Sequence, residues 1–449
     1  MGGVVATAAR EQWNTSFGFV AAAVGSAVGL GNMWRFSYLT AEQGGAAFVG
    51  LYLFFTLIVG LPVLLAELTV GRGASKSPIL ALEHYGGRSW RLLGALFVLT
   101  GFLILSYYSV IAGWTVRYAG ELLWFGVPLD PGDHFSQMSQ GLTAFLFHIG
   151  FMAVTMLIVG SGVTRGIERV SVVAMPLLFV LVCGLAIYAT TLEGASAGYA
   201  YYLNAQFSNA LSMEVVVSAA GQSFFSLSLG MGAMLTFASY LGRESNLPRE
   251  SIRIAAADFG VAFLAGLMVF PIIFALGVEA DVSESTLGAL FVALPKAFAS
   301  MGFVGRFVGV AFFLALIVGA LTSAISLLEV VVSAAVDGLD WSRPRAVWVA
   351  GVLIAGIGSF AAWDLGILDV MDQIANNILL LFGALMLSLF VGWVMPDPMA
   401  EVQKGTGRMA WYSTWRFLLR WLVPIALLVV LFYSVPSTLE NVWHLYVRS

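Results

Sequence analysis

Residues Ala21–Phe36 read AAAVGSAVGLGNMWRF, and the fold prediction rests on this stretch. Gly25, Gly29 and Gly31 lie in the middle of an otherwise apolar segment and are followed at once by Asn32. One interpretation is close helix packing, since Gly25 and Gly29 have the four-residue spacing of small residues at helix–helix contacts. The other interpretation is a broken helix that lines a site, because irregular backbone at membrane depth is tolerated only around a cavity.

A second interrupted segment favours the broken helix. Ser223–Gly232 reads SFFSLSLGMG and places three serines and two glycines inside another apolar segment. The two interruptions fall in the first and the sixth apolar segments, which hold the same place in two halves of five. Paired interruptions of this kind indicate a transport site near the membrane midplane, between two inverted repeats.

The composition indicates a membrane protein. Of the 449 residues, 60% are hydrophobic and 10% are charged, and the mean hydropathy is +0.92. Soluble domains are about half apolar and roughly a quarter charged. The net charge of −4 provides no basic surface for nucleic acid, and the four histidines lack metal-ligand spacing. The one cysteine, Cys183, cannot form an internal disulfide. We therefore predict an all-α polytopic membrane protein and exclude disordered, nucleic-acid-binding and disulfide-rich proteins.

Hydrophobic segments give the expected number of spanning helices, each of which needs about 20 mostly apolar residues. We expect a single transmembrane domain over residues 1–449, with a first repeat at about 10–192, a second at about 214–395, and an additional C-terminal helix at about 411–446. The N-terminus lacks the features of a cleavable signal and is expected to be retained. Eleven segments are predicted to span, at approximately 13–38, 46–70, 90–124, 142–160, 167–192, 214–241, 252–280, 301–337, 344–362, 369–395 and 411–434.

Basic residues set the expected orientation. With the N-terminus in the cytoplasm, sixteen of the 21 lysines and arginines fall in cytoplasmic segments, as the positive-inside rule requires. An odd number of spans then places the C-terminus outside. Residues 126–140, 193–212 and 279–301 become external segments, and the last contains an apolar piece that is too short to span.

Five motifs resemble the neurotransmitter:sodium symporter family, and in particular its bacterial amino-acid branch. They occur in the expected order between Arg10 and about Trp393, and they are GSAVGLGNMWRF, AELTVGR, Tyr107–Tyr108, GQSFFSLSLGMG and GALTSAIS. The resemblance implies the LeuT-type fold, with a 5+5 inverted repeat and with helices 1 and 6 broken. It also implies sodium-coupled symport by alternating access in a prokaryotic cytoplasmic membrane. The expected partners are the lipid bilayer and a small-molecule amino acid, and the oligomeric state stays open.

The resemblance implies two sodium ions and a set of oxygen ligands for each. The first set is Ala27, Asn32, Ser226 and Asp258, together with the carboxylate of the substrate. The second set is Gly25, Val28, Gly319, Thr322 and Ser323. Hard cations prefer such carbonyl, hydroxyl and carboxylate oxygens. The alternative for Thr322 and Ser323 is hydroxyls that bond back to carbonyls of their own helix.

Asp258 departs from the family pattern, in which many members have asparagine. A carboxylate near the bilayer centre costs about 2.5–3.5 kcal/mol, so it should face a partner or a cavity. Chloride-dependent members place an anion near the first sodium, while many bacterial members use a carboxylate at the position of Ala262. We predict that Asp258 supplies this charge and that no chloride is required. The alternative is a residue solvated beyond the cytoplasmic end of its helix.

The matching positions also imply a substrate pocket without charged side chains. Backbone amides at the broken helix end suit a substrate carboxylate, and Gly29 stands where amine transporters carry an aspartate. A neutral amino acid, preferably large and hydrophobic or aromatic, is therefore expected. The pocket residues are Ala27, Gly29, Leu30, Gly31, Ile104, Tyr108, Phe225, Ser226, Ser228, Met231, Ser323 and Leu327.

Gate residues follow from the same resemblance. The external gate is expected to contain Arg35 and Asp372, with Gln222 and Phe225 beside them. The cytoplasmic gate is expected to contain Arg10 and Asp337, with Trp13, Ser239 and Tyr240 nearby.

Four further positions carry expectations. Glu67 follows the pattern of an acid that accepts hydrogen bonds from the unwound backbones. Glu329 is a departure from the bacterial leucine transporter and is expected either to titrate or to pair with a basic residue. Gly166 and Pro176 enclose a segment that either unwinds to admit water or forms an ordinary proline kink.

The sequence also bears on functions other than symport. No nucleophile–base or metal arrangement indicates an enzyme, so no catalytic residue is predicted. A channel would need a continuous polar pore, whereas the polar residues cluster at one depth and at two gates. A sodium-dependent amino-acid sensor of the same fold, and a symporter for another small zwitterion, stay open.

Overall fold

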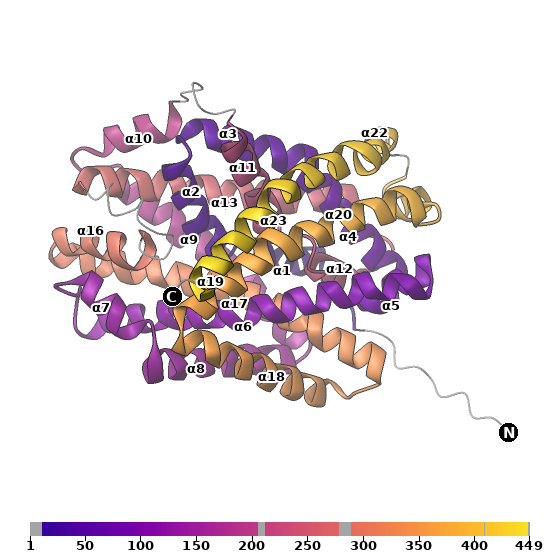
Figure 1. Ribbon diagram of the computed structural model, residues 1–449, viewed down its shortest axis with the longest axis horizontal. Helices are drawn as coiled ribbons and strands as arrows, with labels where there is room; N and C mark the ends of the chain where they lie inside the picture. The colour runs from indigo at the N-terminus through magenta and orange to yellow at the C-terminus, as the bar shows by residue number, and fades with distance from the viewer. Residues whose placement is uncertain (1–10, 205–211, 278–288, 408, 448–449) are drawn as a thin grey trace.

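The computed structural model describes residues 11–204, 212–277, 289–407 and 409–447. Within these ranges the regular secondary structure is helical throughout (Figure 1). The α-helices of the first half are α1 (Ser16–Ala27), α2 (Phe36–Glu42), α3 (Ala46–Phe55), α4 (Leu61–Ala74), α5 (Pro78–Gly86), α6 (Arg91–Trp124), α7 (Pro131–Met138), α8 (Gly141–Gly160), α9 (Arg169–Ala189) and α10 (Ala195–Leu203). Those that follow are α11 (Met213–Ser226), α12 (Ala233–Ala238), α13 (Leu247–Leu276), α16 (Leu294–Ser300), α17 (Phe303–Leu339), α18 (Arg343–Trp363), α19 (Leu365–Ile374), α20 (Leu380–Leu389), α21 (Pro398–Gln403), α22 (Tyr412–Phe417) and α23 (Val423–Val447).

Short turns of other helical types join several of these helices into longer rods. A 3-10 turn at Arg88–Trp90 leads into α6. The π-helical turns are at Gly31–Arg35, Thr56–Gly60, Val163–Glu168, Ala289–Ala293, Ala375–Leu379, Phe390–Val394 and Leu418–Leu422.

The predicted spans are present in the structure. In the described part of the chain, nine helical segments are long and apolar enough to cross a membrane. The pair Ser16–Ala27 and Gly31–Glu42, bent by 52° at its break, forms a tenth. The predicted span at 214–241 is also found, but it is divided into α11, with 14 residues, and α12, with six. The last helix continues past the predicted end at 434 and reaches Val447.

Two breaks interrupt the helices at the places that the glycine-rich motifs indicated. Helix α1 ends at Ala27, and the ψ of 94° at the next residue, Val28, is extended rather than helical. Helix α11 is followed by backbone in the left-handed region at Ser228 (φ 54°), Gly230 (φ 80°) and Gly232 (φ 74°). Glycine adopts this region without the steric cost of a Cβ atom, so the two glycines permit the break. Close helix packing by itself therefore does not explain the first glycine-rich motif, because the helix is broken there.

Long helices enclose the breaks. Helices α6 and α17 pack against each other, and α1 packs against α9, α13 and α17. Helix α23, drawn in yellow, runs alongside α20 in Figure 1. Aromatic side chains such as Trp348, Trp363 and Phe432 are exposed on the outer faces of α18 and α23. Such faces are suited to lipid, whereas the polar groups described below are buried at the breaks.

The predicted external segments contain short helices. Residues 126–140 include α7, and residues 193–212 include α10. The apolar piece of 279–301 corresponds to α16 with the π-helical turn before it. Residues 205–211 and 278–288 of these segments lie outside the described residues.

Candidate functional site

A small cavity of about 30 Å³ lies where the two broken helices meet. It is bounded by both breaks, by α6 and by α17. Its walls are formed by Ser26, Ala27, Gly29, Gly31, Ile104, Tyr108, Phe225, Ser228, Met231, Ser323 and Leu327. Ten of the twelve residues predicted for the substrate pocket line this cavity. Leu30 and Ser226 lie beside it, and Ser26 is an additional wall residue.

Glycines leave the space that forms the cavity. A Cβ atom on Gly29 would lie 2.5 Å from Ser323 Oγ and 2.8 Å from the Tyr108 hydroxyl. A Cβ atom on Gly31 would collide with the Phe225 ring. Side chains at either position would therefore occupy the volume that a ligand needs.

Polar contacts fix the unwound backbone around the cavity. The Leu30 amide donates to the Tyr108 hydroxyl at 3.2 Å, and Gln222 Nε2 donates to the Gly31 carbonyl at 3.1 Å. Ser228 Oγ donates to the Ser26 carbonyl at 2.8 Å, which joins the two breaks directly. Backbone groups that helix breaking leaves free thus find partners inside the protein, as burial requires.

The predicted first sodium site is a compact cluster beside the cavity. Asn32 Nδ2 donates to Ser226 Oγ at 2.9 Å and to Asp258 Oδ1 at 2.7 Å. Ser226 Oγ donates to the Asp258 carboxylate at 2.8–2.9 Å. Asp258 is fully buried, so the alternative of a carboxylate solvated at a helix end is wrong. The cluster places one formal negative charge against the unwound turn of the first helix.

The predicted second sodium residues also converge, on the other side of the first break. A Cβ atom on Gly25 would lie 2.9 Å from Thr322 Cβ, and one on Gly319 would lie 3.4 Å from the Val28 carbonyl. Thr322 Oγ1 bonds back to carbonyls of its own helix, as the alternative interpretation held. Ser323 Oγ instead reaches across to the Gly25 carbonyl at 3.3 Å. One of the two hydroxyls therefore already faces the broken helix.

Glu67 holds the second break. Its carboxylate accepts hydrogen bonds from the Gly230 amide at 2.8 Å and from the Leu235 amide at 3.1 Å. The side chain is fully buried in α4. The acid therefore binds the interruption itself, at Gly230, and the first turn of α12, at Leu235. These contacts match the expectation for the second of the two unwound backbones.

The end of the bundle that carries Arg35 opens into a larger cavity of about 440 Å³. Arg35 lies over the Phe225 ring, with its guanidinium carbon 4.9 Å from the ring centre. Within the described residues no ion pair joins Arg35 to Asp372, and Asp372 Oδ1 accepts a bond from Asn376 at 2.6 Å. The cavity is lined by Arg35, Leu39, Met213, Glu214, Val217, Ser218, Gly221, Asn377, Leu381, Tyr433, Ser434, Ser437 and Thr438.

At the opposite end of the bundle, Trp13 is bonded to the end of α12 and to the residues just after it. Its indole donates to the Phe237 carbonyl at 2.8 Å, and its amide donates to the Tyr240 carbonyl at 3.2 Å. The Tyr240 hydroxyl donates to Glu329 at 2.6 Å, and Glu329 pairs with Arg343 at 2.5 Å. The question left open for Glu329 is thereby answered, since this carboxylate has a basic partner.

The remaining predicted members of this gate lie nearby or outside the described residues. Asp337 accepts a bond from the Ser77 amide at 2.6 Å, and Ser239 Oγ donates to the Thr236 carbonyl at 2.6 Å. Arg10 lies outside the described residues.

Comparison with known proteins assigns this architecture. The profile of the sodium:neurotransmitter symporter family matches residues 10–140 and 133–447. The chain belongs to the sodium:neurotransmitter symporter family.

Relatives of this symporter include the uncharacterized sodium-dependent transporter YhdH of Bacillus subtilis, 36% identical over 93% of this chain and 96% of that protein. The uncharacterized sodium-dependent transporter MJ1319 of Methanocaldococcus jannaschii is 34% identical over 96% of this chain and 92% of its own. The crystal structure of MhsT in complex with L-phenylalanine is 40% identical, with a TM-score of 0.87 over 95% of this chain and 99% of that chain. The predicted family and the LeuT-type fold are therefore confirmed, and the protein is a sodium-dependent transporter.

Tyr52 is a residue of the symporter's buried cluster that the sequence did not reveal. Its hydroxyl donates to Ser226 Oγ at 2.9 Å and to Asp258 Oδ2 at 3.2 Å. A tyrosine in an apolar segment is common in membrane helices, and its partners lie more than 170 positions away. Only the tertiary structure brings them together.

The segment between Gly166 and Pro176 is helical in this symporter. Gly166 lies in the π-helical turn Val163–Glu168, and Pro176 lies inside the continuous helix α9. The structure therefore shows a helix with an internal proline, and unwinding stays a prediction.

Proposed function

We propose that this symporter carries a neutral L-amino acid with a large hydrophobic or aromatic side chain, together with two sodium ions and without chloride. The observation that carries the proposal is the uncharged cavity at the two breaks, whose wall residues Gly31 and Phe225 directly adjoin Asn32 and Ser226 of the cluster with Asp258. A substrate in this cavity would meet the backbone of the first break and the proposed sodium ligands at one end and an apolar wall at the other.

The backbone end of the cavity suits an amino-acid carboxylate. The π-helical turn Gly31–Arg35 begins at this wall, and helix N-termini carry a partial positive charge that favours anions. The Tyr108 hydroxyl lies at the same wall. Gly29 has no side chain, so this position offers no carboxylate to pair with an amine that lacks an acid group of its own. The cavity therefore argues against decarboxylated substrates.

The apolar end sets the proposed side-chain preference. Ile104, Phe225, Met231 and Leu327 supply hydrophobic surface without a charged group. Met231 has an unbranched thioether that repacks around different shapes. MhsT, whose structure contains L-phenylalanine, supports an aromatic or large hydrophobic substrate.

Coupling follows from shared contacts. A substrate carboxylate that touches the first sodium ion makes each ligand raise the affinity for the other by the same factor. Two sodium ions entering with a zwitterion carry two charges, worth about 4.6 kcal/mol at a potential of 100 mV. We propose that Trp13 closes the cytoplasmic end and Arg35 marks the external end, in a prokaryotic cytoplasmic membrane with the C-terminus outside.

The test is a thermal-stability screen of the purified protein with the twenty amino acids, in sodium chloride and in potassium chloride. We expect stabilisation by tryptophan, phenylalanine, tyrosine or leucine in sodium alone. Stabilisation only by charged amino acids or by amines would overturn the substrate assignment. Counterflow of the labelled substrate in proteoliposomes then separates a carrier from a sensor, because a sensor binds without exchange.

A further inference from the structure

Arg72 is a buried arginine that neither sodium site nor the substrate cavity uses. It lies in the last turn of α4, and its side chain is 0% exposed. A guanidinium keeps its charge in proteins, so its burial must be compensated by several acceptors. Residues of two connecting segments that are far apart in the sequence provide them.

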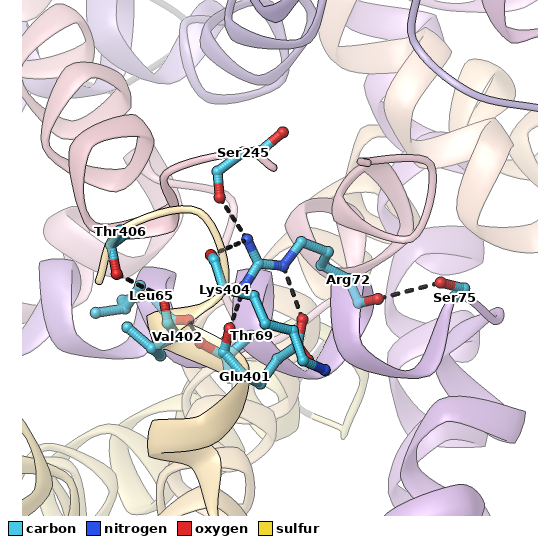
Figure 2. A network of polar contacts seen from close by, with 9 residues as sticks. All are labelled: Leu65, Thr69, Arg72, Ser75, Ser245, Glu401, Val402, Lys404 and Thr406. Atoms are coloured by element: carbon cyan, nitrogen blue, oxygen red, sulfur yellow. Dashed lines mark hydrogen bonds and ion pairs between the residues drawn. The ribbon is translucent and has the colours of Figure 1, made fainter. Parts of the chain in front are cut away.

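Figure 2 shows the acceptors around Arg72. Nε donates to Glu401 Oε1 at 2.8 Å, and Nη2 donates to the Glu401 carbonyl. Nη1 donates to the Ser245 carbonyl and, at 3.1 Å, to the Lys404 carbonyl. Glu401 belongs to α21, in the connection before the last spanning helix, while Ser245 follows α12.

Direct backbone packing reinforces this junction. Gly405 has a φ of 81°, and a Cβ atom there would lie 2.5 Å from the Glu244 carbonyl oxygen. The loop after α21 therefore rests directly on the loop after α12. Arg72 bonds to both loops, through the carbonyls of Ser245 and Lys404.

Helix α4 consequently binds both ends of the stretch 230–245, which contains α12. Glu67 accepts from the amides of Gly230 and Leu235 at its start, and Arg72 donates to the Ser245 carbonyl at its end. The two charged residues are five positions apart, about 7.5 Å along the helix axis. An acid thus binds free amides and a base binds a free carbonyl of one short segment.

The segment held in this way is the one that Trp13 contacts. Trp13 bonds to the carbonyls of Phe237 and Tyr240, which lie between Leu235 and Ser245. A displacement of the Ser245 turn would shift these carbonyls relative to the indole. We propose that Arg72 is a positioning residue for the cytoplasmic gate, and that its pair with Glu401 ties gate closure to the connection before the last helix. This inference rests on the proposed function, because it assigns the Trp13 end to the cytoplasm.

The experiment reads gate closure without substrate. Ser239 lies between the two residues that Trp13 contacts and is 2% exposed. Ser239→Cys in a Cys183→Ser background therefore places a single, buried thiol at the proposed gate. Labelling by a membrane-impermeant maleimide is measured in inside-out vesicles. Arg72→Gln is expected to raise the labelling rate several-fold, and to weaken the apparent substrate affinity as the closed state becomes less populated.

A paired apolar variant separates positioning from simple stability. Replacing a buried ion pair by two apolar residues is often neutral or stabilising, so Arg72→Met with Glu401→Met should recover the melting temperature lost in Arg72→Gln. The Ser245 carbonyl stays unheld in this double variant, so its labelling rate should stay high. Lys404→Gln is the matched control, because the Lys404 side chain pairs with Glu401 and is 43% exposed. The Lys404→Gln variant should be labelled at the same rate as the Ser239→Cys, Cys183→Ser protein without a further substitution.

Two results would overturn the inference: background labelling in Arg72→Gln, or recovery of background labelling in the double variant. The second would show a buried ion pair with a purely structural role. Absence of sodium-dependent amino-acid binding in the reporter protein, with the Arg72 effect intact, would instead contradict the proposed function alone.

Discussion

At the scale of single residues, the cavity between the two breaks exists because Gly29 and Gly31 have no side chains. Gly29 and Gly31 were recognised because glycine inside an apolar segment has a clear sequence signature. Their importance lies in the close approach of Ser323, Tyr108 and Phe225. Polar residues with one long-range partner, such as Tyr52, leave no comparable signature and could not be predicted.

Gly29→Ala is expected to weaken substrate binding by at least about tenfold, because the new Cβ atom would fall within 2.5 Å of Ser323 Oγ. Sodium-dependent binding of labelled substrate to purified protein measures the effect. Gly184→Ala is the matched control, since a Cβ atom at Gly184 meets nothing within 4 Å. Equal binding by both variants would contradict the assignment of the cavity.

Asp258→Asn is expected to reduce uptake in proteoliposomes at least about tenfold, because it removes the negative charge at the proposed first sodium site. Chloride should partly restore uptake in this variant, relative to gluconate, while the parent protein should transport equally in both. Tyr52→Phe removes one hydrogen bond to the carboxylate and keeps the charge. This second variant should stay independent of chloride, and a chloride requirement in the parent protein would refute the proposal.

At the scale of elements, the sequence predicted where the spanning helices lie better than it predicted the contacts that hold their breaks and ends. Hydrophobicity located the spans because lipid demands about 20 apolar residues. The break in α11 was located by glycines, yet its geometry depends on Glu67, which lies about 160 positions earlier. The contact of Arg72 with Glu401 likewise joins segments that are far apart in the sequence, and that of Glu329 with Arg343 joins the consecutive helices α17 and α18. Hydropathy carries no information about either ion pair.

Glu67→Gln is expected to destabilise the α11–α12 break. A neutral amide has one acceptor oxygen where the carboxylate has two, and an unsatisfied buried amide costs about 1–3 kcal/mol. Thermal unfolding should show a lower melting temperature and a smaller stabilisation by sodium and substrate together. Glu193→Gln, in a loop with no comparable hydrogen bonds described, serves as control. An unchanged ligand-induced shift in Glu67→Gln would argue against a role for this acid at the site.

At the scale of the whole molecule, sodium binding and substrate binding are expected to form one linked equilibrium. If two ions bind with one amino acid, the apparent dissociation constant should fall with the square of the sodium concentration below saturation. Isothermal titration over a series of sodium concentrations, at constant ionic strength with potassium, measures this slope. A slope of one would remove the second sodium ion from the proposal.

The larger cavity, at the Arg35 end of the bundle, is formed by two parts of the chain. Tyr433, Ser434, Ser437 and Thr438 belong to α23, beyond the segment in which the family motifs occur, whereas Arg35 and Glu214 come from the two broken helices. Helix α23 lies outside the two predicted repeats, so the residues of this wall are not constrained by the packing of one repeat against the other. Laboratory evolution that targets the polar face of α23 should therefore alter access to the transporter while leaving the ion and substrate ligands intact.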